Sequence, residues 1–342
     1  MSCGRFFVKL TAMVKIGGKI FKTNIFLAPL SGVSDLAFRM MAREGGAGMA
    51  FFEMVSSNAV CRRQKKTMSF LKTVEKDRPI ACQLLGNNSD IMIDAARIVS
   101  DETDAEFIDI NAACPVGKVV KNGQGAALLF DPGNLFRIVE KLTSSGIMPV
   151  TVKLRIGFDS VNQAELLYIA KGLEGSGAAA LFVHGRTRKQ MYGGPVNYEA
   201  IKKIKESVGI PVFGSGNIFS PQLAEKMFKE TGCDGIFVAR GSFGNPGIFG
   251  DIEKYLKSGG LPEKRTIAQK IKDLKKHLSC IEKYGEKSPR GQIGFMKKIA
   301  LYYIKVFDDS ASVRAKLSAA CDYGEMLKII DRTFTGGGQA RA

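Results

Sequence analysis

The sequence lacks an apolar run approaching the roughly 20 residues that a membrane-spanning helix needs. It also lacks low-complexity tracts and a recognisable secretory leader, so we expect a soluble globular protein of the cytoplasm. Seven cysteines form an odd set in which no pair has CxxC spacing. This predicts free thiols in a reducing compartment rather than a disulfide framework. No His or second Cys stands at ligand spacing from Cys114, and we therefore expect no metal site.

Acidic residues are too few to balance the basic ones. The 342 residues carry 50 Lys and Arg against 33 Asp and Glu, which gives a formal net charge of +17. Clustered cations gain affinity for phosphate backbones by releasing counterions, so this excess points to a polyanionic partner. A basic, solvated surface is the alternative that composition alone leaves open.

Short apolar runs bounded by turn residues recur eight times along the chain, about 25 to 40 residues apart. They are residues 25–29, 49–53, 80–84, 107–111, 150–153, 180–184, 212–215 and 235–239. Their Val, Ile, Leu and Phe content is typical of buried parallel strands, and segments with helical periodicity lie between them. The pattern predicts an α/β fold, a (β/α)8 TIM barrel. A doubly wound open sheet is the alternative, disfavoured because no GxGxxG follows the first strand.

Most of these runs end in a polar or ionisable residue. The run-end residues are Pro29, Glu53, Gln83, Asn111, Lys153, His184, Ser215 and Arg240. Active sites of TIM barrels form at the carboxyl ends of the strands, so we expect these groups to converge on a ligand. Helix capping is the competing explanation, credible for Glu53 alone.

The last two strand ends have the composition of a phosphate site. The segments Gly214-Ser-Gly-Asn-Ile218 and Ala239-Arg-Gly-Ser242 supply glycines and backbone N–H groups where barrels commonly bind phosphate. Lys153 would point towards the barrel axis and stabilise negative charge on an electron-rich ring. With Gln83 and the backbone of residues 29–31, this favours flavin mononucleotide (FMN) over a sugar phosphate.

Cys114 follows the fourth run and precedes Pro115, on a loop that also carries Gly117 and Lys118. A buried small hydrophobe, a metal ligand and a redox thiol are the ordinary interpretations of a lone cysteine. A thiol that stays protonated near neutral pH can also act as a general acid. We assign Cys114 that role.

The two ends of the chain depart from the repeating pattern. Residues 13–250 are expected to form the barrel domain and residues 251–332 a separate helical domain, followed by a disordered tail at 333–342. Between Glu263 and Lys298 there are eleven Lys or Arg against four Asp or Glu, and we place the polyanion contact there. His277 lies on an expected helix and is expected to be a surface or packing residue. The chain has a natural opening at Met13, with a short alternating segment turned by Gly17-Gly18, so residues 1–12 are expected to be a non-native or disordered extension.

Four motifs in order carry a family resemblance. They are Leu27-Ala-Pro-Leu-Ser-Gly-Val-Ser-Asp-Leu-Ala-Phe-Arg39, Asp109-Ile-Asn-Ala-Ala-Cys-Pro115, Lys153-Leu-Arg155 and Val183-His-Gly-Arg-Thr-Arg188. From about Met13 to Arg332 the chain resembles the tRNA-dihydrouridine synthases, most closely their bacterial B-type branch. The resemblance implies a flavin-dependent barrel and a helical tRNA-binding domain. It also implies reduction of the C5–C6 bond of uridine with NADPH, or NADH, as reductant, by a chain that we expect to be a monomer.

The resemblance also assigns site residues. Flavin contacts fall on Pro29, Leu30, Ser31, Gln83, Lys153, Ser215, Gly216, Asn217, Ala239 and Arg240, with His184 beside the flavin. Cys114 becomes the proton donor to C5 while hydride reaches C6. Substrate contacts are expected at Asn111, Arg155, Tyr192, Lys118, Lys121, Arg186, Lys297 and Lys298.

Three alternatives stay open. The first is the same chemistry on ribosomal RNA. A flavin barrel acting on a small molecule, such as a dihydroorotate or enoate reductase, would explain the barrel but not the basic helices. A non-catalytic RNA-binding descendant is disfavoured because Cys114, Lys153 and His184 are all present.

Overall fold

The computed structural model describes residues 13–285, 288–305 and 310–334. The expected extension at residues 1–12 lies outside these ranges, as does the expected tail from residue 335 onwards. No helix in the described ranges is long and apolar enough to cross a membrane.

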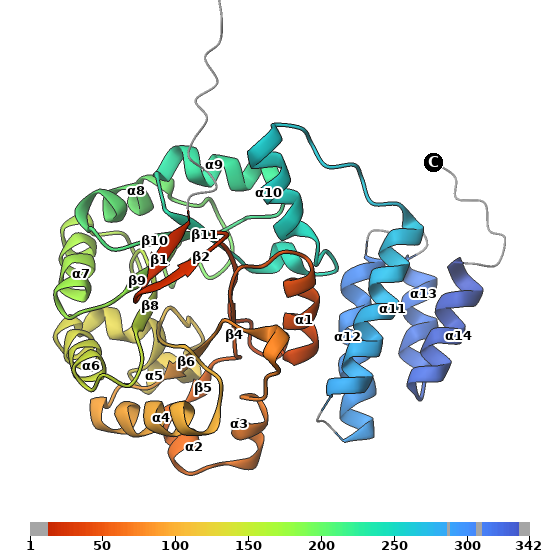
Figure 1. Cartoon of the computed structure of the whole chain (residues 1–342), viewed down its shortest axis with the longest axis horizontal. Helices are drawn as coiled ribbons and strands as arrows, with labels where there is room; N and C mark the ends of the chain where they lie inside the picture. Colours follow the sequence, from red (N-terminus) through yellow and green to blue (C-terminus); the bar gives the residue numbers. More distant parts are fainter. Residues whose placement is uncertain (1–12, 286–287, 306–309, 335–342) are drawn as a thin grey trace, which may run out of the picture.

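Parallel strands form a barrel (Figure 1), which confirms the predicted fold. Its strands are β3 (Ile25–Leu27), β4 (Ala50–Phe51), β6 (Ile80–Leu85), β7 (Phe107–Ala112), β8 (Val150–Arg155), β9 (Ala180–His184), β10 (Val212–Ser215) and β11 (Gly235–Val238). They follow the order β3-β11-β10-β9-β8-β7-β6-β4, and the short β5 (Val55–Ser56) also pairs with β6. Two backbone hydrogen bonds join the ends of this order, from Leu27 N to Met49 O and from Gly48 N to Ile25 O, each 2.9 Å long.

Helices alternate with the strands and surround them. They are α1 (Leu36–Glu44), α2 (Ser57–Cys61), α3 (Lys65–Ser69), α4 (Ser89–Glu102), α5 (Gly117–Lys121), α6 (Pro132–Ser144), α7 (Gln163–Gly175), α8 (Tyr198–Ser207), α9 (Pro221–Thr231) and α10 (Ile248–Ser258). Short 3₁₀ helices stand at η1 (Glu75–Asp77), η2 (Gly125–Phe130) and η3 (Arg240–Ser242). Asp, Asn or Ser side chains accept a hydrogen bond from the first turn of α1, α4, α6, α7, α8 and α9. These caps satisfy N–H groups that the first turn leaves without partners and fix where each helix begins.

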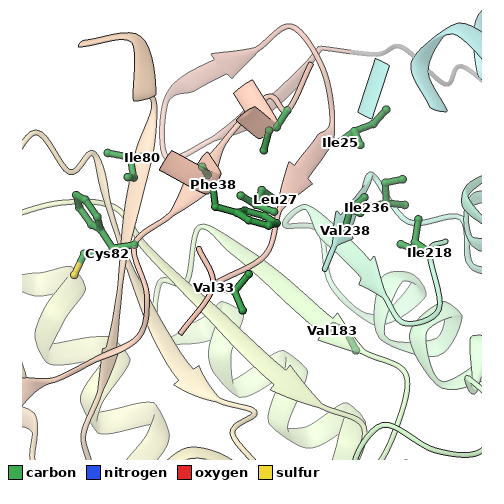
Figure 2. Packing of buried hydrophobic residues seen from close by; sticks show 14 of the residues in the cluster. Ile25, Leu27, Val33, Phe38, Ile80, Cys82, Val183, Ile218, Ile236 and Val238 are labelled. Carbon is green, nitrogen blue, oxygen red and sulfur yellow. The ribbon is translucent and has the colours of Figure 1, made fainter. Parts of the chain in front are cut away.

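Alternation along the strands divides the core into two layers. Outward-facing residues such as Ile25 and Leu27 pack against the helices, and Figure 2 shows Leu27 of β3 beside Phe38 of α1. Inward-facing residues form a second cluster inside the barrel, dominated by phenylalanines at 26, 51, 107, 182, 213 and 237. The Phe182 and Phe237 rings stack with their centroids 4.4 Å apart. The barrel interior is therefore filled with side chains at this level.

A hairpin covers the amino-terminal end of the barrel (Figure 1). Its strands β1 (Val14–Ile16) and β2 (Lys19–Phe21) pair antiparallel around the Gly17-Gly18 turn, where both glycines have positive φ. Phe21 packs against Phe26 and Phe107, with ring centroids 5.0 and 5.9 Å apart. The hairpin closes the floor beneath the phenylalanine layer.

Four further helices pack beside α1 (Figure 1). They are α11 (Ile267–Tyr284), α12 (Pro289–Ile304), α13 (Ser310–Ala319) and α14 (Tyr323–Phe334). His277 of α11 is buried between the two parts, 3.0 Å from the Tyr303 hydroxyl and with its ring centroid 5.5 Å from that of Phe38. Of the surface and packing roles expected for His277, the structure shows the packing one. An ion pair of 2.5 Å between Lys276 and Glu44 spans the same interface.

The boundary between barrel and helical bundle differs from the expected one. Asp251 lies inside α10, which packs on α9 and β3 and so belongs to the barrel. Residues 259–266 link α10 to α11. The bundle also ends later than Arg332, because α14 continues to Phe334. Helical periodicity alone could not distinguish α10 from the helices of the bundle.

Candidate active site

The alternation that fills the barrel with phenylalanine also selects the polar residues above it. Inward positions on β7 run Phe107, Asp109, Asn111, and those on β9 run Phe182, His184. β10 changes in the same way from Phe213 to Ser215, and β6 changes from Ala81 to Gln83, so on these strands apolar residues form the lower layer and polar groups the upper one. A polar cup therefore stands at the carboxyl ends of the strands, as expected for a TIM barrel.

This cup is a cavity of about 450 Å³, within the range of small-molecule sites. Most of the expected site residues line it: Pro29, Leu30, Ser31, Gln83, Asn111, Cys114, Lys153, Arg155, His184, Tyr192, Ser215, Gly216, Asn217, Ala239, Arg240 and Lys298. The convergence of strand ends expected from the sequence is therefore present. Glu53 instead accepts a hydrogen bond from the Gly32 backbone and holds the β3–α1 loop.

A buried chain of hydrogen bonds fixes the orientation of the side chains below Cys114. Asp109 accepts from Gln83 Nε2 at 2.6 Å and from the Thr151 hydroxyl at 2.7 Å. Gln83 must then present Oε1 to Asn111, whose Nδ2 donates to it at 2.8 Å. Burial raises the pKa of Asp109 to about 6, although both hydrogen bonds and Lys153 oppose this.

Asn111 in turn holds the loop that carries the thiol. Its Oδ1 accepts from Ala113 N at 3.0 Å and from Cys114 N at 2.8 Å. From the other side, Cys114 O accepts from Ala126 N at 3.0 Å. Gly125 has φ +63°, and a Cβ there would stand 2.8 Å from Cys114 O and 2.9 Å from Cys114 Cβ, so this position requires glycine. Cys114 is thus clamped between β7 and η2, with its side chain on the cavity wall.

Cations dominate the electrostatics of the cup. Burial and the neighbouring Arg155 guanidinium lower the pKa of Lys153 to about 8. Burial, followed by the charges of Lys153, Arg155, Arg186 and Arg240, holds the pKa of His184 far below its ordinary value. His184 is therefore neutral at pH 7 and offers one N–H and one acceptor nitrogen. A cup with this charge favours an anionic ligand.

Arg155, the last residue of β8, ties together the loops that follow β7 and β9. Its Nε donates to Ala113 O, and Nη1 donates to Thr187 O and Met191 O, each at 2.8 Å. Next to it, the Tyr192 ring lies 5.7 Å from the Arg155 guanidinium and 5.2 Å from that of Arg240. Tyr192 is 53% exposed, so it forms part of the cavity rim.

The turn after β10 is shaped to receive an anion. Gly216 has φ +133°, and a Cβ there would meet Val196 at 2.9 Å. No described residue accepts a hydrogen bond from the N–H of Gly216 or Asn217. Arg240, which makes no ion pair with any described residue, lies on the neighbouring η3 and also lines the cavity. Free N–H groups and a cation together match the chemistry of phosphate binding.

Some expected substrate residues lie elsewhere. Arg186 is 1% exposed and donates to the carbonyls of Gly193 and Gly194, so it supports the loop that carries Tyr192. Lys297 donates to Ser318 O of α13 at 2.6 Å. Lys118 and Lys121 are exposed on α5, outside the cavity. None of these partners could be read from spacing in the sequence.

The sequence did not identify every residue of the cavity. Met54 lines it and lies 3.2 Å from Asn111 Nδ2, while Phe243 and Tyr302 form a stacked pair in its wall with centroids 4.4 Å apart. Tyr302 belongs to α12, and no signal in its own segment connects it with the barrel. Asp109 begins the motif Asp109 to Pro115, and its spacing of two residues from Asn111 could have indicated that both face the barrel interior. Within the described ranges, no three His, Cys, Asp or Glu side chains form a group that could hold a metal.

The closed parallel barrel and the polar cup at its carboxyl end define a TIM-barrel protein with a prepared ligand site. The family model described as Dihydrouridine synthase (Dus) matches residues 26–335. The chain therefore belongs to the dihydrouridine synthase family, which confirms the resemblance found in the sequence motifs.

Curated relatives agree with this. A "Probable tRNA-dihydrouridine synthase" of Rickettsia prowazekii is 35% identical over 91% of this chain and 94% of its own length. "tRNA-dihydrouridine synthase B" of Pseudomonas aeruginosa is 36% identical over 94% of this chain and 96% of its own length. The same-named protein of Pseudomonas putida is 38% identical over 79% of this chain and 80% of its own.

Solved structures agree on the fold. Histamine dehydrogenase from Rhizobium sp. 4-9 aligns with a TM-score of 0.58 and 15% identity, covering 80% of this chain and 51% of that one. An old yellow enzyme homologue from Zymomonas mobilis aligns with a TM-score of 0.50 and 14% identity, covering 77% of this chain and 96% of that one. At such identities the likeness concerns the barrel alone.

Proposed function

We propose that the chain reduces uridine in tRNA to 5,6-dihydrouridine, with FMN as bound cofactor and NADPH or NADH as reductant. The observation that carries the proposal is the meeting, in one cavity, of an anion-binding turn, Lys153 and a clamped Cys114. Family membership supports the reaction class, and the names of the curated relatives support tRNA as the substrate.

The donor set of the cup fits FMN. The phosphate would be held by the N–H groups of Gly216 and Asn217 and by Arg240, whose charge has no carboxylate partner within the described ranges. Gln83, Lys153 and the backbone of residues 29–31 supply donors and a cation for the polar edge of the flavin ring. When bound, FMN supplies the hydride that C6 of uracil receives.

The residues of this chain provide the other requirements. Cys114 donates its thiol proton to C5, and the thiolate that remains is reprotonated from solvent. Asn111 keeps the thiol on the cavity wall through its bond to Cys114 N. Lys153 and Arg155 stabilise negative charge that develops on the ring being reduced. Neutral His184 can donate or accept a hydrogen bond without adding a further charge.

A second hollow suits the part of the RNA that stays outside the cup when the target uridine enters it. A groove of about 1140 Å³ runs between the barrel and the helical bundle, lined by Lys65, Lys66, Lys72, Lys283 and Tyr284 among others. It adjoins the cup across residues 32–35, where Lys298 donates to Gly32 O at 2.8 Å. A uridine inside folded RNA has to leave its stack to enter such a cup, and a basic groove beside it would hold the backbone.

This groove revises the expected RNA contact. Lys275 pairs with Asp331, Lys276 pairs with Glu44, and Lys297 donates to the backbone of α13. These internal bonds make the three lysines weaker candidates for phosphate binding than Lys65, Lys66 and Lys283. Lys298 stays a candidate because it lines the cup itself.

An absorbance experiment tests the proposal. The purified protein should be yellow, bleach with NADPH without oxygen, and regain its colour when unmodified tRNA is added. A colourless protein, or a reduced flavin that ignores RNA but is reoxidised by enones or orotate, would contradict it. Mapping dihydrouridine in total RNA from cells lacking the protein separates the two RNA substrates, because loss confined to ribosomal RNA would contradict the assignment to tRNA.

A further inference from the structure

A small hollow adjoins the cup on the side away from the helical bundle. It measures about 230 Å³ and is lined mainly by the loops that follow β7 and β8. Arg155 lines both this hollow and the cup, so one side chain forms the partition between them. The proposed reaction uses only this partition and leaves the hollow without a role.

Two aromatic rings dominate the hollow. The centroids of Phe130 and Phe158 lie 4.2 Å apart, and Phe130 is 65% exposed. The Arg188 guanidinium lies 5.0 Å from the centre of the Phe158 ring. Arg188 makes no ion pair within the described ranges, and its buried Nε has no hydrogen-bond partner there. Phe130 is thus a large exposed ring, and the neighbouring Phe158 ring lies beside a cation that has no ion pair among the described residues. Such a surface indicates that a ligand covers it.

The hollow is tied to the catalytic thiol. Phe130 is the last residue of η2, and the second residue of η2, Ala126, donates to Cys114 O. At the 3₁₀ rise of about 2 Å per residue, Phe130 stands about 8 Å along the helix from that bond. This is the scale of the distance between neighbouring nucleotides. The exposed Lys118 and Lys121 stand on α5, which packs against η2.

The chemistry of the hollow favours a nucleobase over a phosphate. Asp159 and Glu165 also line it, and their carboxylates would repel a phosphate. A base carries no charge, and its π-face stacks on aromatic rings and on guanidinium groups. The lysines of α5 lie outside the hollow, where the backbone of that nucleotide would run.

We propose that Phe130 and Phe158, with Arg188, form a stacking platform for an unpaired base next to the uridine that enters the cup. Lys118 and Lys121 contact the phosphates beside that base. This inference rests on the proposed function and deepens it, because it makes the enzyme read an unpaired neighbour of its target. An unstacked neighbour would also make the target uridine easier to extrude.

The test is a double-mutant cycle, in which one side chain of the protein and one base of the RNA are removed singly and together. Unmodified tRNA transcripts are prepared intact or with a single abasic nucleotide at each unpaired position near the reduced uridine. Their dissociation constants are measured for wild type, Phe130→Ala, Phe130→Trp and Tyr168→Ala. Tyr168 is the matched control, since it is 61% exposed but packs against Phe136 on the outer helices.

We expect Phe130→Ala to weaken binding of the intact transcript about tenfold, as removal of one stacking partner does. One abasic position should cost wild type the same factor and cost Phe130→Ala nothing more. Phe130→Trp should retain affinity, and Tyr168→Ala should match wild type. Unchanged affinity of Phe130→Ala, or an equal abasic loss in wild type and Phe130→Ala at every position, would overturn the platform.

The platform and the proposed function can fail separately. Absence of dihydrouridine in wild-type reactions contradicts the function, whatever the binding cycle gives. Normal dihydrouridine formation without coupling at Phe130 contradicts the platform alone. Thermal melting and the flavin spectrum of Phe130→Ala establish that its fold is intact, which its exposure predicts.

Discussion

The Asn111 side chain accepts a hydrogen bond from the backbone N–H of Cys114, with Oδ1 and N 2.8 Å apart. A residue of a rigid strand thereby sets the position of a thiol on a loop. The orientation of the Asn111 amide is itself set by Gln83, and that of Gln83 by buried Asp109. Cys114 is thus positioned by three side chains that need not touch the substrate.

Asn111→Ala should lower turnover by at least about 100-fold and leave the barrel folded. It removes the acceptor for two backbone N–H groups, so the loop loses the geometry that holds the thiol near the substrate. Single-turnover reoxidation by tRNA measures the loss, and the alkylation rate of Cys114 reports the change in the loop. Asn111→Asp is the comparison variant, because it keeps the acceptor for Cys114 N while it loses the donor to Gln83 and Met54 and adds a negative charge. If Asn111→Ala and Asn111→Asp lose turnover equally, the bond to Cys114 is not what matters.

Cys114→Ala should retain flavin and bind tRNA normally but lose most of its turnover. The thiol supplies a proton in the proposed reaction, and Ala fills nearly the same space without one. The measurement is flavin content, tRNA affinity and reoxidation rate on the same preparation. Cys321→Ala gives the matched control, since Cys321 is an exposed thiol outside the cavity. Turnover of Cys114→Ala at the wild-type rate would refute the role of general acid.

Lys153→Met should stabilise the flavin-free protein at pH 7 and abolish flavin binding. The pKa of Lys153 is about 8 in the folded protein against an ordinary 10.5, so folding disfavours its charged form. The cost, roughly 3 kcal/mol, is present in full below pH 8 and fades as pH rises towards 10.5. Urea unfolding at pH 7 and pH 10 should therefore give a difference between variant and wild type that shrinks at the higher pH. A difference independent of pH would contradict a buried, charged Lys153.

Replacing Lys65, Lys66 and Lys283 together by Gln should weaken tRNA binding and reduce its dependence on salt. Each lost phosphate contact lowers the slope of log affinity against log salt by about 0.7 to 0.9. The control replaces Lys202, Lys203 and Lys226, which pair with glutamates on the outer helices. Turnover at saturating tRNA should be retained in both triple variants. An equal effect of the two sets would mean that net charge, and not the groove, decides the affinity.

Much of this molecule follows from short-range pattern. The eight apolar runs became strands because hydrophobic periodicity is written into consecutive residues, and the alternation of Phe107, Asp109 and Asn111 already places chemistry above a packed layer. The residues at strand ends converge because parallel strands share one carboxyl edge. Chain order and alternation were therefore sufficient to place Lys153, His184 and Asn111 together at the carboxyl ends of the strands.

The sequence pattern could not predict ion pairs, hydrogen bonds and packing contacts between residues that lie far apart in the chain. Lys275 lies in the segment from Glu263 to Lys298 where the polyanion contact was expected, but in the structure it pairs with Asp331 of α14. Arg186 belongs to a motif of candidate site residues in the sequence. In the structure, however, its guanidinium donates hydrogen bonds to the carbonyls of Gly193 and Gly194. Tyr302 reaches the cup only because α12 docks beside the barrel. Such contacts depend on tertiary packing, which local periodicity does not encode.

The hairpin of β1 and β2 and the phenylalanine layer leave the cup closed from below. Among the described residues, Lys153 and Cys114 are therefore reached from the opposite side, through the opening of the cup at the carboxyl ends of the strands. On the proposed function, a nicotinamide and a uridine both use this opening, so the nicotinamide has to leave before the uridine enters. The enzyme then alternates between its two partners, and an excess of either one delays the other.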